Sequence, residues 1–233
     1  MQKSVIIVAG GQGMRFNQEL PKQFFYIRER PLLMHTIDLF HFYDRKMQII
    51  VGIHENFLSH WESVCEQFNF DVKHILTAGG NTRFHTVKNA LPSVNPGNLV
   101  GIHDAVRPLL YRKTIDACYE AAENQGASLP CVELHDSVRE ITSSGSRFVN
   151  RDSFRLVQTP QVFQYDILMK GYEQEYSDEF TDDASVVEMA GFPVTMVGGN
   201  PENIKITTPE DMLYAEAIFD TYKKKSGFFP AKA

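Results

Sequence analysis

The sequence predicts an α/β fold in which a doubly wound, mostly parallel sheet is covered by helices. Three observations support this prediction. Short apolar runs alternate with segments of helical periodicity as far as about residue 133. The first run, VIIV at 5–8, is continuously apolar, which is typical of a strand buried on both faces. The length of 233 residues, with 43% hydrophobic and 22% charged residues, suits one globular α/β domain.

Local patterns assign the individual elements. Apolar residues at alternating or continuous positions predict the strands, which are 5–8, 48–53, 72–76, 99–103, 127–133 and 193–197. Apolar residues at helical spacing predict the helices, which are 31–42, 55–68, 81–91, 112–124, 165–175, 182–190 and 209–224. Asn81 is a good N-cap for the third of these helices, and Pro92 ends it.

Two segments depart from the strand–helix alternation. Residues 135–154 alternate around the turn cluster Ser143-Ser144-Gly145-Ser146, which predicts a β-hairpin arm protruding from the domain. Residues 226–233 show no periodic pattern, and we expect a loose C-terminal tail. The single predicted domain therefore spans residues 1–225, with 135–154 as its arm.

Composition excludes several classes of function. The formal net charge of −6 gives no general electrostatic footprint for nucleic acid. No apolar stretch approaches the roughly 20 residues that cross a bilayer. The chain starts directly with a strand instead of a secretory signal, and its three cysteines form no CxxC pair. We therefore expect a cytoplasmic protein without nucleic-acid or membrane partners.

A ligand site is expected at the carboxyl ends of the parallel strands, where α/β sheets bind their ligands. Four such places carry informative residues: the Gly10–Arg15 loop, Gly79-Gly80-Asn81, Asp104-Ala105 and Lys205. The glycines of the first loop leave backbone N–H groups free to approach a ligand, and Arg15 and Lys22 add positive charge. The loop suits a polyphosphate, although an ordinary surface loop with two solvated cations explains it equally well.

The other candidate residues also have structural interpretations. Asp104 beside phosphates would act through a divalent cation, but an aspartate at this position could instead cap a helix. Lys205 lies on the opposite side of its segment from Ile204 and Ile206, so it could simply face solvent. Arg151 suits an exposed surface position, and Thr181-Asp182-Asp183 fits an N-cap followed by first-turn acids.

The motifs, taken together, resemble those of a known family. The segments AGGQGMR at 9–15 and PKQ at 21–23 are similar to the nucleotide loop of sugar-phosphate nucleotidyltransferases. Four more motifs narrow the resemblance to the 2-C-methyl-D-erythritol 4-phosphate cytidylyltransferase family: HDAVRP at 103–108, QTPQ at 158–161, TDDAS at 181–185 and NIKIT at 203–207. The resemblance extends from Val5 to about Ala217.

This resemblance implies a Rossmann-like nucleotidyltransferase fold and a reaction. CTP and 2-C-methyl-D-erythritol 4-phosphate would give the cytidine diphosphate sugar alcohol and pyrophosphate, with Mg²⁺ as the cofactor. The substrate phosphate attacks the α-phosphorus in line and is already ionised, so no general base is required. Catalysis then depends on positioning and on neutralising charge.

The resemblance also assigns roles to residues. The implied catalytic residues are Arg15, Lys22, Arg151 and Lys205. The implied nucleotide-binding residues are Ala9, Gly10, Gly11, Gly13, Arg15, Lys22, Gly80, Asn81, Thr86, Asp104, Ala105 and Lys205. The implied residues for the polyol phosphate are Arg107, Ser137, Arg151, Thr159, Thr181 and Lys205. Asp104 would bind the metal. In this family the arm is exchanged within a homodimer, so Ser137 and Arg151 would act on the partner subunit's substrate.

Two alternatives remain open at the level of sequence. Gly10-Gly11 and the HDAVRP motif also occur in ribitol 5-phosphate cytidylyltransferases, so the polyol could be ribitol 5-phosphate. The context of Thr181–Ser185 and of Arg151-Asp152 favours methylerythritol phosphate. A nucleotide-binding protein without catalysis is the second alternative. The presence of Arg15, Lys22, Asp104 and Lys205 argues against it.

Overall fold

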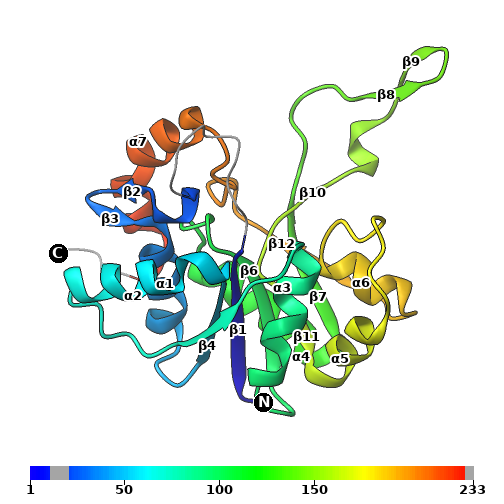
Figure 1. The fold of residues 1–233 in the computed structure, drawn as a ribbon. Coiled ribbons are helices and arrows are strands. Elements are labelled where there is room, and N and C mark those ends of the chain that lie inside the picture. The colour runs from blue at the N-terminus through cyan, green and yellow to red at the C-terminus, as the bar shows by residue number, and fades with distance from the viewer. Residues whose placement is uncertain (11–20, 229–233) are drawn as a thin grey trace.

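The computed structural model describes residues 1–10 and 21–228. Its centre is an eight-stranded sheet in the order β10-β7-β11-β6-β1-β4-β5, with β12 also pairing with β7 (Figure 1). The strands of this sheet are β1 (Lys3–Ala9), β4 (Gln48–Ile53), β5 (Ile75–Ala78), β6 (Leu99–Asp104), β7 (Ala127–Val132), β10 (Leu156–Val157), β11 (Gln161–Gln164) and β12 (Thr195–Gly198). An α/β sheet with helices on both faces was predicted, and the structure confirms it.

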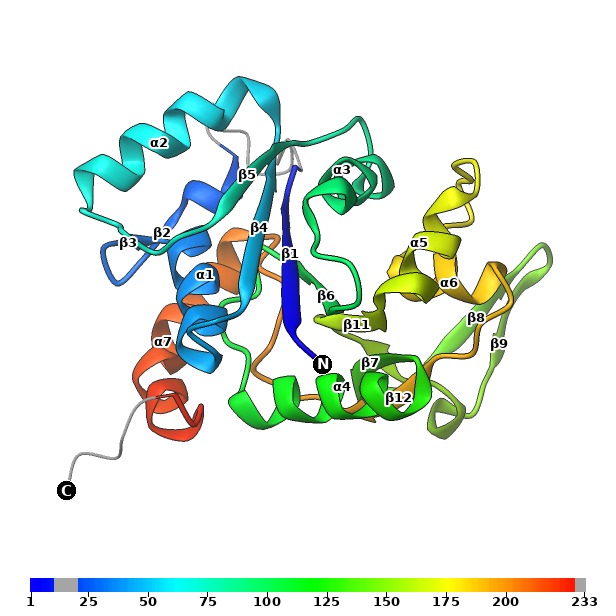
Figure 2. The same ribbon diagram turned by 90° about the horizontal axis from the view of Figure 1, so that it is seen from below.

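Helices cover the two faces of the sheet. They are α1 (Leu32–Tyr43), α2 (Leu58–Gln67), α3 (Arg83–Ala90), α4 (Arg112–Gln125), α5 (Tyr165–Glu173), α6 (Asp183–Met189) and α7 (Pro209–Lys225). Val5 and Ile7 of β1 pack in one core with residues of α1, α2, α4 and α7, whereas Ile6 packs in a second core with residues of α3, α5 and α6. Figure 2 shows α1, α2 and α7 on one side of β1 and β4, and α3, α5 and α6 on the other. Alternation along one buried strand therefore holds two layers of helices together.

The first strand behaves as its sequence predicts. Val5, Ile6 and Ile7 are completely buried, and β1 pairs in parallel with β4 on one side and β6 on the other. Strand β5 continues the parallel arrangement beyond β4. The carboxyl ends of these four strands consequently meet at one edge of the sheet.

The sequence prediction missed β11. Two apolar residues between Gln161 and Gln164 are too few to show a strand period, yet β11 runs antiparallel between β6 and β7. Its position makes the sheet mixed. The predicted strand at 72–76 begins later, as β5 at Ile75, and the segment 203–207 forms no strand.

The starts of α2 and α3 differ in detail from the predicted helices, and the chain contains further short elements. The N-cap of α3 is Thr82, whose hydroxyl accepts from the His85 N–H, and not the expected Asn81. The helix predicted at 55–68 starts as a 3-10 turn (Glu55–Phe57) before α2. Other short elements are the 3-10 turns Lys22–Phe24, Leu91–Ser93 and Arg151–Ser153, and the paired strands β2 (Tyr26–Ile27) and β3 (Arg30–Pro31).

The predicted arm is confirmed as a hairpin. Strands β8 (Arg139–Thr142) and β9 (Gly145–Phe148) pair antiparallel and project away from the main sheet (Figure 1). The predicted loose tail is wrong at its start, because Ser226 is buried and its carbonyl accepts from the Arg112 N–H at 2.8 Å. Residues 229–233 lie outside the described part of the chain. Within the described residues, no helix is long and apolar enough to cross a bilayer.

Gln161 joins β11 to α6, and its loss should cost stability. Its amide donates to Asp182 Oδ2 at 2.7 Å and accepts from the Ala184 N–H at 2.8 Å, with the side chain 1% exposed. We predict that Gln161→Ala lowers the free energy of unfolding by about 2 kcal/mol, since it leaves a buried N–H and a carboxylate oxygen without these partners. Urea denaturation of the wild type and the variant measures this difference in the free energy of unfolding.

Gln164→Ala is the matched control at the other end of β11. Its amide only supplements the last carbonyls of α4, including that of Glu123 at a solvent-exposed position. We expect a loss below about 1 kcal/mol for this variant. Equal losses for the two variants would contradict the role given to Gln161.

Candidate functional site

The carboxyl ends of the parallel strands enclose a cavity of about 420 Å³. Ala9 ends β1, Asp104 ends β6, and His54 and Gly80 follow β4 and β5, and all four residues line the cavity. The structure brings together nine of the residues predicted for a nucleotide site: Ala9, Gly10, Lys22, Gly80, Asn81, Thr86, Asp104, Ala105 and Lys205. The predicted residues Gly11, Gly13 and Arg15 lie outside the described residues.

A second cavity of about 300 Å³ lies on the other side of Asp104. Arg107, Thr159 and Thr181, which were predicted to bind a polyol phosphate, line it together. Asp104, Arg83 and Lys205 line both cavities. These three side chains therefore form the common wall between the two candidate ligand sites.

Three cations surround the Asp104 carboxylate. Arg83 Nε lies 3.3 Å from Oδ1, while Arg107 Nε and Lys205 Nζ lie 3.2 Å and 3.1 Å from Oδ2. Burial alone would raise the pKa of Asp104, but Arg83, Lys205 and Arg107 outweigh it and hold that pKa well below its usual range. Asp104 is therefore ionised, and its charge arranges the cations at the wall between the cavities.

Lys205 has the orientation that its sequence pattern predicted. Ile206 is completely buried, and its N–H donates to the Val106 carbonyl at 3.0 Å. This bond fixes the segment beside the end of β6, so the side chain of Lys205, on the opposite face, reaches Asp104. That side chain is still 42% exposed, which leaves the ammonium group accessible to a ligand.

Thr159 and His103 hold the backbone of Asp104. The Thr159 hydroxyl accepts from the Asp104 N–H at 3.1 Å and lies 2.9 Å from Nδ1 of His103, whose Nε2 lies 3.1 Å from the Arg107 carbonyl. A neutral imidazole that accepts at Nδ1 and donates at Nε2 satisfies all three groups. Burial lowers the pKa of His103 to about 4. His103 is therefore a buried, neutral residue that supports the backbone of the site.

Thr86 shapes the glycine segment next to the first cavity. Its hydroxyl accepts from the Gly80 N–H and donates to the Thr82 carbonyl, both at 3.0 Å. A Cβ atom at Gly10 would lie only 2.6 Å from this hydroxyl oxygen. The glycine at position 10 thus allows β1 and α3 to approach closely.

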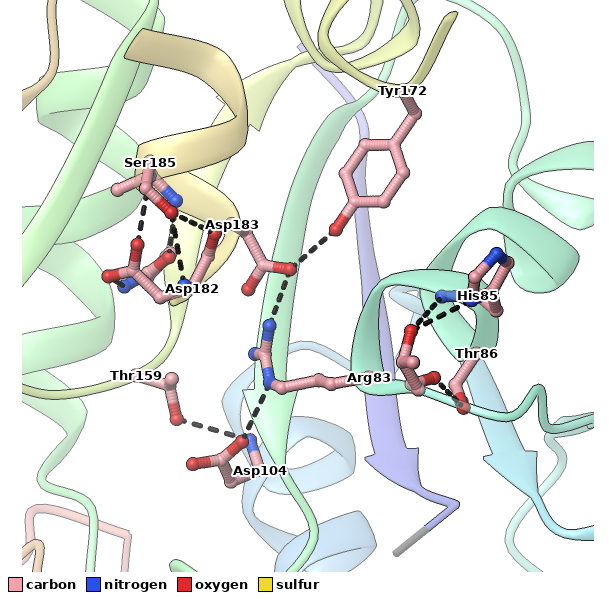
Figure 3. Close-up of polar contacts among 12 residues, drawn as sticks. Arg83, His85, Thr86, Asp104, Thr159, Tyr172, Asp182, Asp183 and Ser185 are labelled. Atoms are coloured by element: carbon pink, nitrogen blue, oxygen red, sulfur yellow. Dashed lines mark hydrogen bonds and ion pairs between the residues drawn. The ribbon is translucent and has the colours of Figure 1, made fainter. Parts of the chain in front are cut away.

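Arg83 is the main residue that the sequence prediction missed. It is the first residue of α3, and its guanidinium lies between Asp104 and Asp183 (Figure 3). The N-cap of α6 is Asp182, within a capping box with Ser185, and not the expected Thr181. Asp183 is a first-turn acid, as expected, but it is completely buried and lies 2.6 Å from Arg83 Nη1. An arginine directly after the GGNT turn that follows β5 was the available signal.

The two predicted residues of the arm do not reach either cavity of their own chain. Ser137 and Arg151 are both exposed, and Arg151 donates to the His135 carbonyl at the base of the arm. Neither residue is among the described residues that line the cavities beside Asp104.

The site does not resemble one for a resident metal ion. The described residues contain no group of three or more His, Cys, Asp or Glu side chains able to hold a metal. Both oxygens of Asp104 already contact cations. Asp182, which lines the second cavity, has its carboxylate bonded to the Gln161 amide and the Ser185 N–H. This donor set fits only a divalent cation that is held chiefly by the phosphates of a bound ligand.

The fold and site define the class of protein. A parallel sheet with glycine-containing turns and lysines around a cavity at its carboxyl edge is characteristic of α/β nucleotide-binding enzymes. Solved structures of nucleotidyltransferases share the fold. That of 2-C-methyl-D-erythritol 4-phosphate cytidylyltransferase from Thermus thermophilus has a TM-score of 0.76 at 30% identity, covering 94% of this chain and 98% of that one. That of 4-diphosphocytidyl-2C-methyl-D-erythritol synthase from Anaerococcus prevotii has a TM-score of 0.79 at 27% identity, with the same coverage.

The chain belongs to the IspD family, 2-C-methyl-D-erythritol 4-phosphate cytidylyltransferase, whose model matches residues 4–221. The enzyme of that name from Bacteroides fragilis is 49% identical over 218 residues, covering 94% of this chain and all of the relative. That from Azobacteroides pseudotrichonymphae is also 49% identical, over 220 residues, with 94% and 99% coverage. The family expected from the six motifs is confirmed.

His103 should make stability depend on pH. Its folded pKa of about 4 lies below the ordinary value of 6.5, so the unfolded chain binds the proton first. The neutral imidazole makes its full contribution to the free energy of unfolding above pH 6.5. This contribution is lost as the pH falls toward 4, at up to ~1.4 kcal/mol per pH unit. We predict that His103→Gln shows a shallower fall, measured by urea denaturation between pH 7 and pH 4.

His35 provides the comparison. Burial also lowers its pKa to about 4, so the wild-type slope contains contributions from both imidazoles. His35 contacts the Ile27 carbonyl in the core, away from both cavities. Between pH 7 and pH 4, the free energy of unfolding should fall less steeply in the double variant His35→Gln/His103→Gln than in either single variant. An unchanged slope in His103→Gln would show that this imidazole is not held neutral.

Proposed function

We propose that this protein transfers CMP from CTP to 2-C-methyl-D-erythritol 4-phosphate and releases pyrophosphate, a step of isoprenoid precursor biosynthesis by the non-mevalonate pathway. The observation that supports this most is the pair of cavities that share Asp104, Arg83 and Lys205 as a common wall. A nucleotide in the first and a sugar phosphate in the second would bring their phosphates together at this wall. The family and the names of the relatives supply the identity of the two substrates.

The reaction needs charge neutralisation more than acid–base chemistry. A phosphate oxygen of the sugar alcohol forms a bond to the α-phosphorus of CTP, and the bond from that phosphorus to pyrophosphate breaks. The attacking oxygen is already anionic, so no proton has to be removed from it. Cations placed around the reacting phosphorus supply the required stabilisation.

The first cavity is proposed to hold CTP. Lys22 and Arg15 would stabilise charge on the triphosphate in the transition state, with backbone groups of Gly10, Gly11 and Gly13 around the phosphates. Cytosine and ribose would be recognised by the walls formed by Ala9, Gly80, Asn81, Thr86 and Ala105. Since the Thr86 hydroxyl is hydrogen-bonded to Gly80 and Thr82, we propose that its role is to hold this wall in shape.

The second cavity is proposed to hold the polyol phosphate. Arg107, Thr159 and Thr181 line it, and Lys205 stands between the two substrates. Arg107 also donates from Nη1 to the Asn203 carbonyl at 2.7 Å, so its guanidinium is fixed before a ligand arrives. A preorganised cation of this kind favours binding of a phosphate.

Mg²⁺ is proposed to enter with CTP as part of the substrate. The phosphates would supply most of its ligands, and Asp104 would add one oxygen as Lys205 turns toward the substrate phosphate. The bound metal would neutralise charge on the leaving pyrophosphate.

The arm is proposed to exchange between the subunits of a homodimer. Its hairpin projects from the chain and exposes Ile141 and Phe148, with 81% and 75% of their surface accessible (Figure 1). Large apolar side chains with such exposure are suited to burial against a second copy. Ser137 and Arg151 would then complete the partner subunit's second cavity.

The three free cysteines support a location in the reducing cytoplasm.

A comparison of two substrates tests the proposed function. Purified protein should release pyrophosphate from CTP only when 2-C-methyl-D-erythritol 4-phosphate and a divalent cation are both present. Ribitol 5-phosphate, which the Gly10-Gly11 form also allows, should react at least tenfold more slowly, because a site fitted to one polyol leaves polar groups unpaired with the other. Faster turnover of ribitol 5-phosphate would reverse the substrate assignment. CTP binding without turnover of either polyol phosphate would indicate a non-catalytic protein.

Mixed dimers test the exchanged arm. Arg151→Ala and Lys205→Ala should each be inactive, because each removes one cation from every site. In a heterodimer of the two, one site regains both cations. Full subunit exchange should therefore restore roughly one quarter of wild-type activity, since half the dimers are mixed and each has one intact site. Heterodimers verified by differential tags that stay inactive would argue that Arg151 serves its own chain.

A further inference from the structure

Arg83 touches two acidic side chains near the common wall of the cavities. It lines both cavities, with Nε 3.3 Å from Asp104 Oδ1 and Nη1 2.6 Å from Asp183 Oδ1 (Figure 3). Asp104 ends β6, Arg83 starts α3 and Asp183 starts α6. One guanidinium therefore joins the nucleotide side of the site to the helix that follows Thr181 and Asp182.

Asp183 is built into the core to hold this guanidinium. Its side chain is completely buried, and Oδ1 also accepts from the Tyr172 hydroxyl at 2.7 Å. Tyr172 of α5 is 3% exposed, and burial raises its pKa well above the usual value, so the hydroxyl remains a donor. The other carboxylate oxygen of Asp183 is buried with no hydrogen-bond partner among the described residues.

This arrangement is poorly explained by stability alone. A buried ion pair loses hydration, and well-packed apolar side chains of similar size often stabilise a core equally well. Asp183 additionally keeps one oxygen unsatisfied within the described part of the chain, which makes the pair more costly. The geometry instead gives the pair a directional role, because with Arg83 on Oδ1 the other oxygen of Asp104 faces Lys205 and Arg107.

We propose that Arg83 is a positioning residue for CMP transfer, and that Asp183 and Tyr172 orient it. Arg83 fixes the rotation of the Asp104 carboxylate, and Asp104 in turn holds Lys205 and Arg107 where the two substrates meet. The same chain of contacts sets the spacing between α3 beside the first cavity and α6 beside the second. This inference rests on the proposed function. It assigns a role to Arg83 and Tyr172, which lie outside the six motifs, and to Asp183, which the resemblance left without one.

An apolar replacement separates positioning from stability. Arg83→Met alone leaves Asp183 buried without its cation and should lower the melting temperature. The triple variant Arg83→Met/Asp183→Leu/Tyr172→Phe removes every polar group of the buried pair and should recover a melting temperature near that of the wild type. Its kcat should nevertheless stay about 100-fold below wild type, with the KM for CTP changed much less. Recovery of kcat together with stability would overturn the proposal.

Tyr172→Phe is a milder test that keeps the ion pair. It removes only the hydroxyl that orients Asp183, and kcat should fall between about 3- and 30-fold. Tyr111→Phe is the matched control, because that buried tyrosine donates to Glu202 at 2.8 Å and lines neither cavity. Unchanged kcat in Tyr172→Phe, or equal losses in both variants, would contradict the orienting role.

A crystal structure of the triple variant gives a readout independent of turnover. The proposal predicts that the Asp104 carboxylate rotates and that its 3.1 Å contact with Lys205 Nζ is lost. Wild-type protein that turns over neither polyol phosphate would refute the proposed function without deciding this point. In that case, retention of the contact in the variant would overturn the positioning role, and its loss would support it.

Discussion

The ion pairs of Asp104 are the interaction on which the rest of the site depends. A carboxylate that is 6% exposed at the end of a central strand is costly unless cations accompany it. The cations come from three separate parts of the chain: Arg83 from α3, Arg107 from the turn after β6 and Lys205 from the segment after β12. One buried charge thereby gathers the groups that a phosphate ligand needs, and it holds them in place before the ligand binds.

The topology of the sheet explains why two cavities meet at this carboxylate. The parallel strands β1, β4, β5 and β6 end at one edge and form the first cavity there. The antiparallel strand β11, inserted beside β6, brings Gln161 and the preceding Thr159 to the other side of Asp104, where the second cavity lies. The reversed strand adds the second, as a two-substrate reaction requires.

The strongly apolar, periodic parts of the chain were predictable, and so was the edge at which their strands end. Lys205 could be assigned a direction because Ile204 and Ile206 flank it. Local patterns could not reveal β11, whose apolar core is only two residues long, or the burial of Asp183, which its position at a helix start does not distinguish from a solvated acid. Arg83 was missed because its two partners lie 21 and 100 residues away. Ser137 and Arg151 stay outside both cavities of this chain.

The most direct test of this account is the single-turnover rate of pyrophosphate release by Asp104→Asn at saturating CTP, polyol phosphate and Mg²⁺. The substitution keeps the shape of the side chain and removes its charge. If the charge of Asp104 organises the three cations, the rate should fall by about 100-fold or more. The affinity for CTP should stay within a few-fold of wild type, because the loss of a negative charge near the triphosphate offsets the poorer placement of the cations. A rate close to that of the wild type would contradict the central role given to this carboxylate.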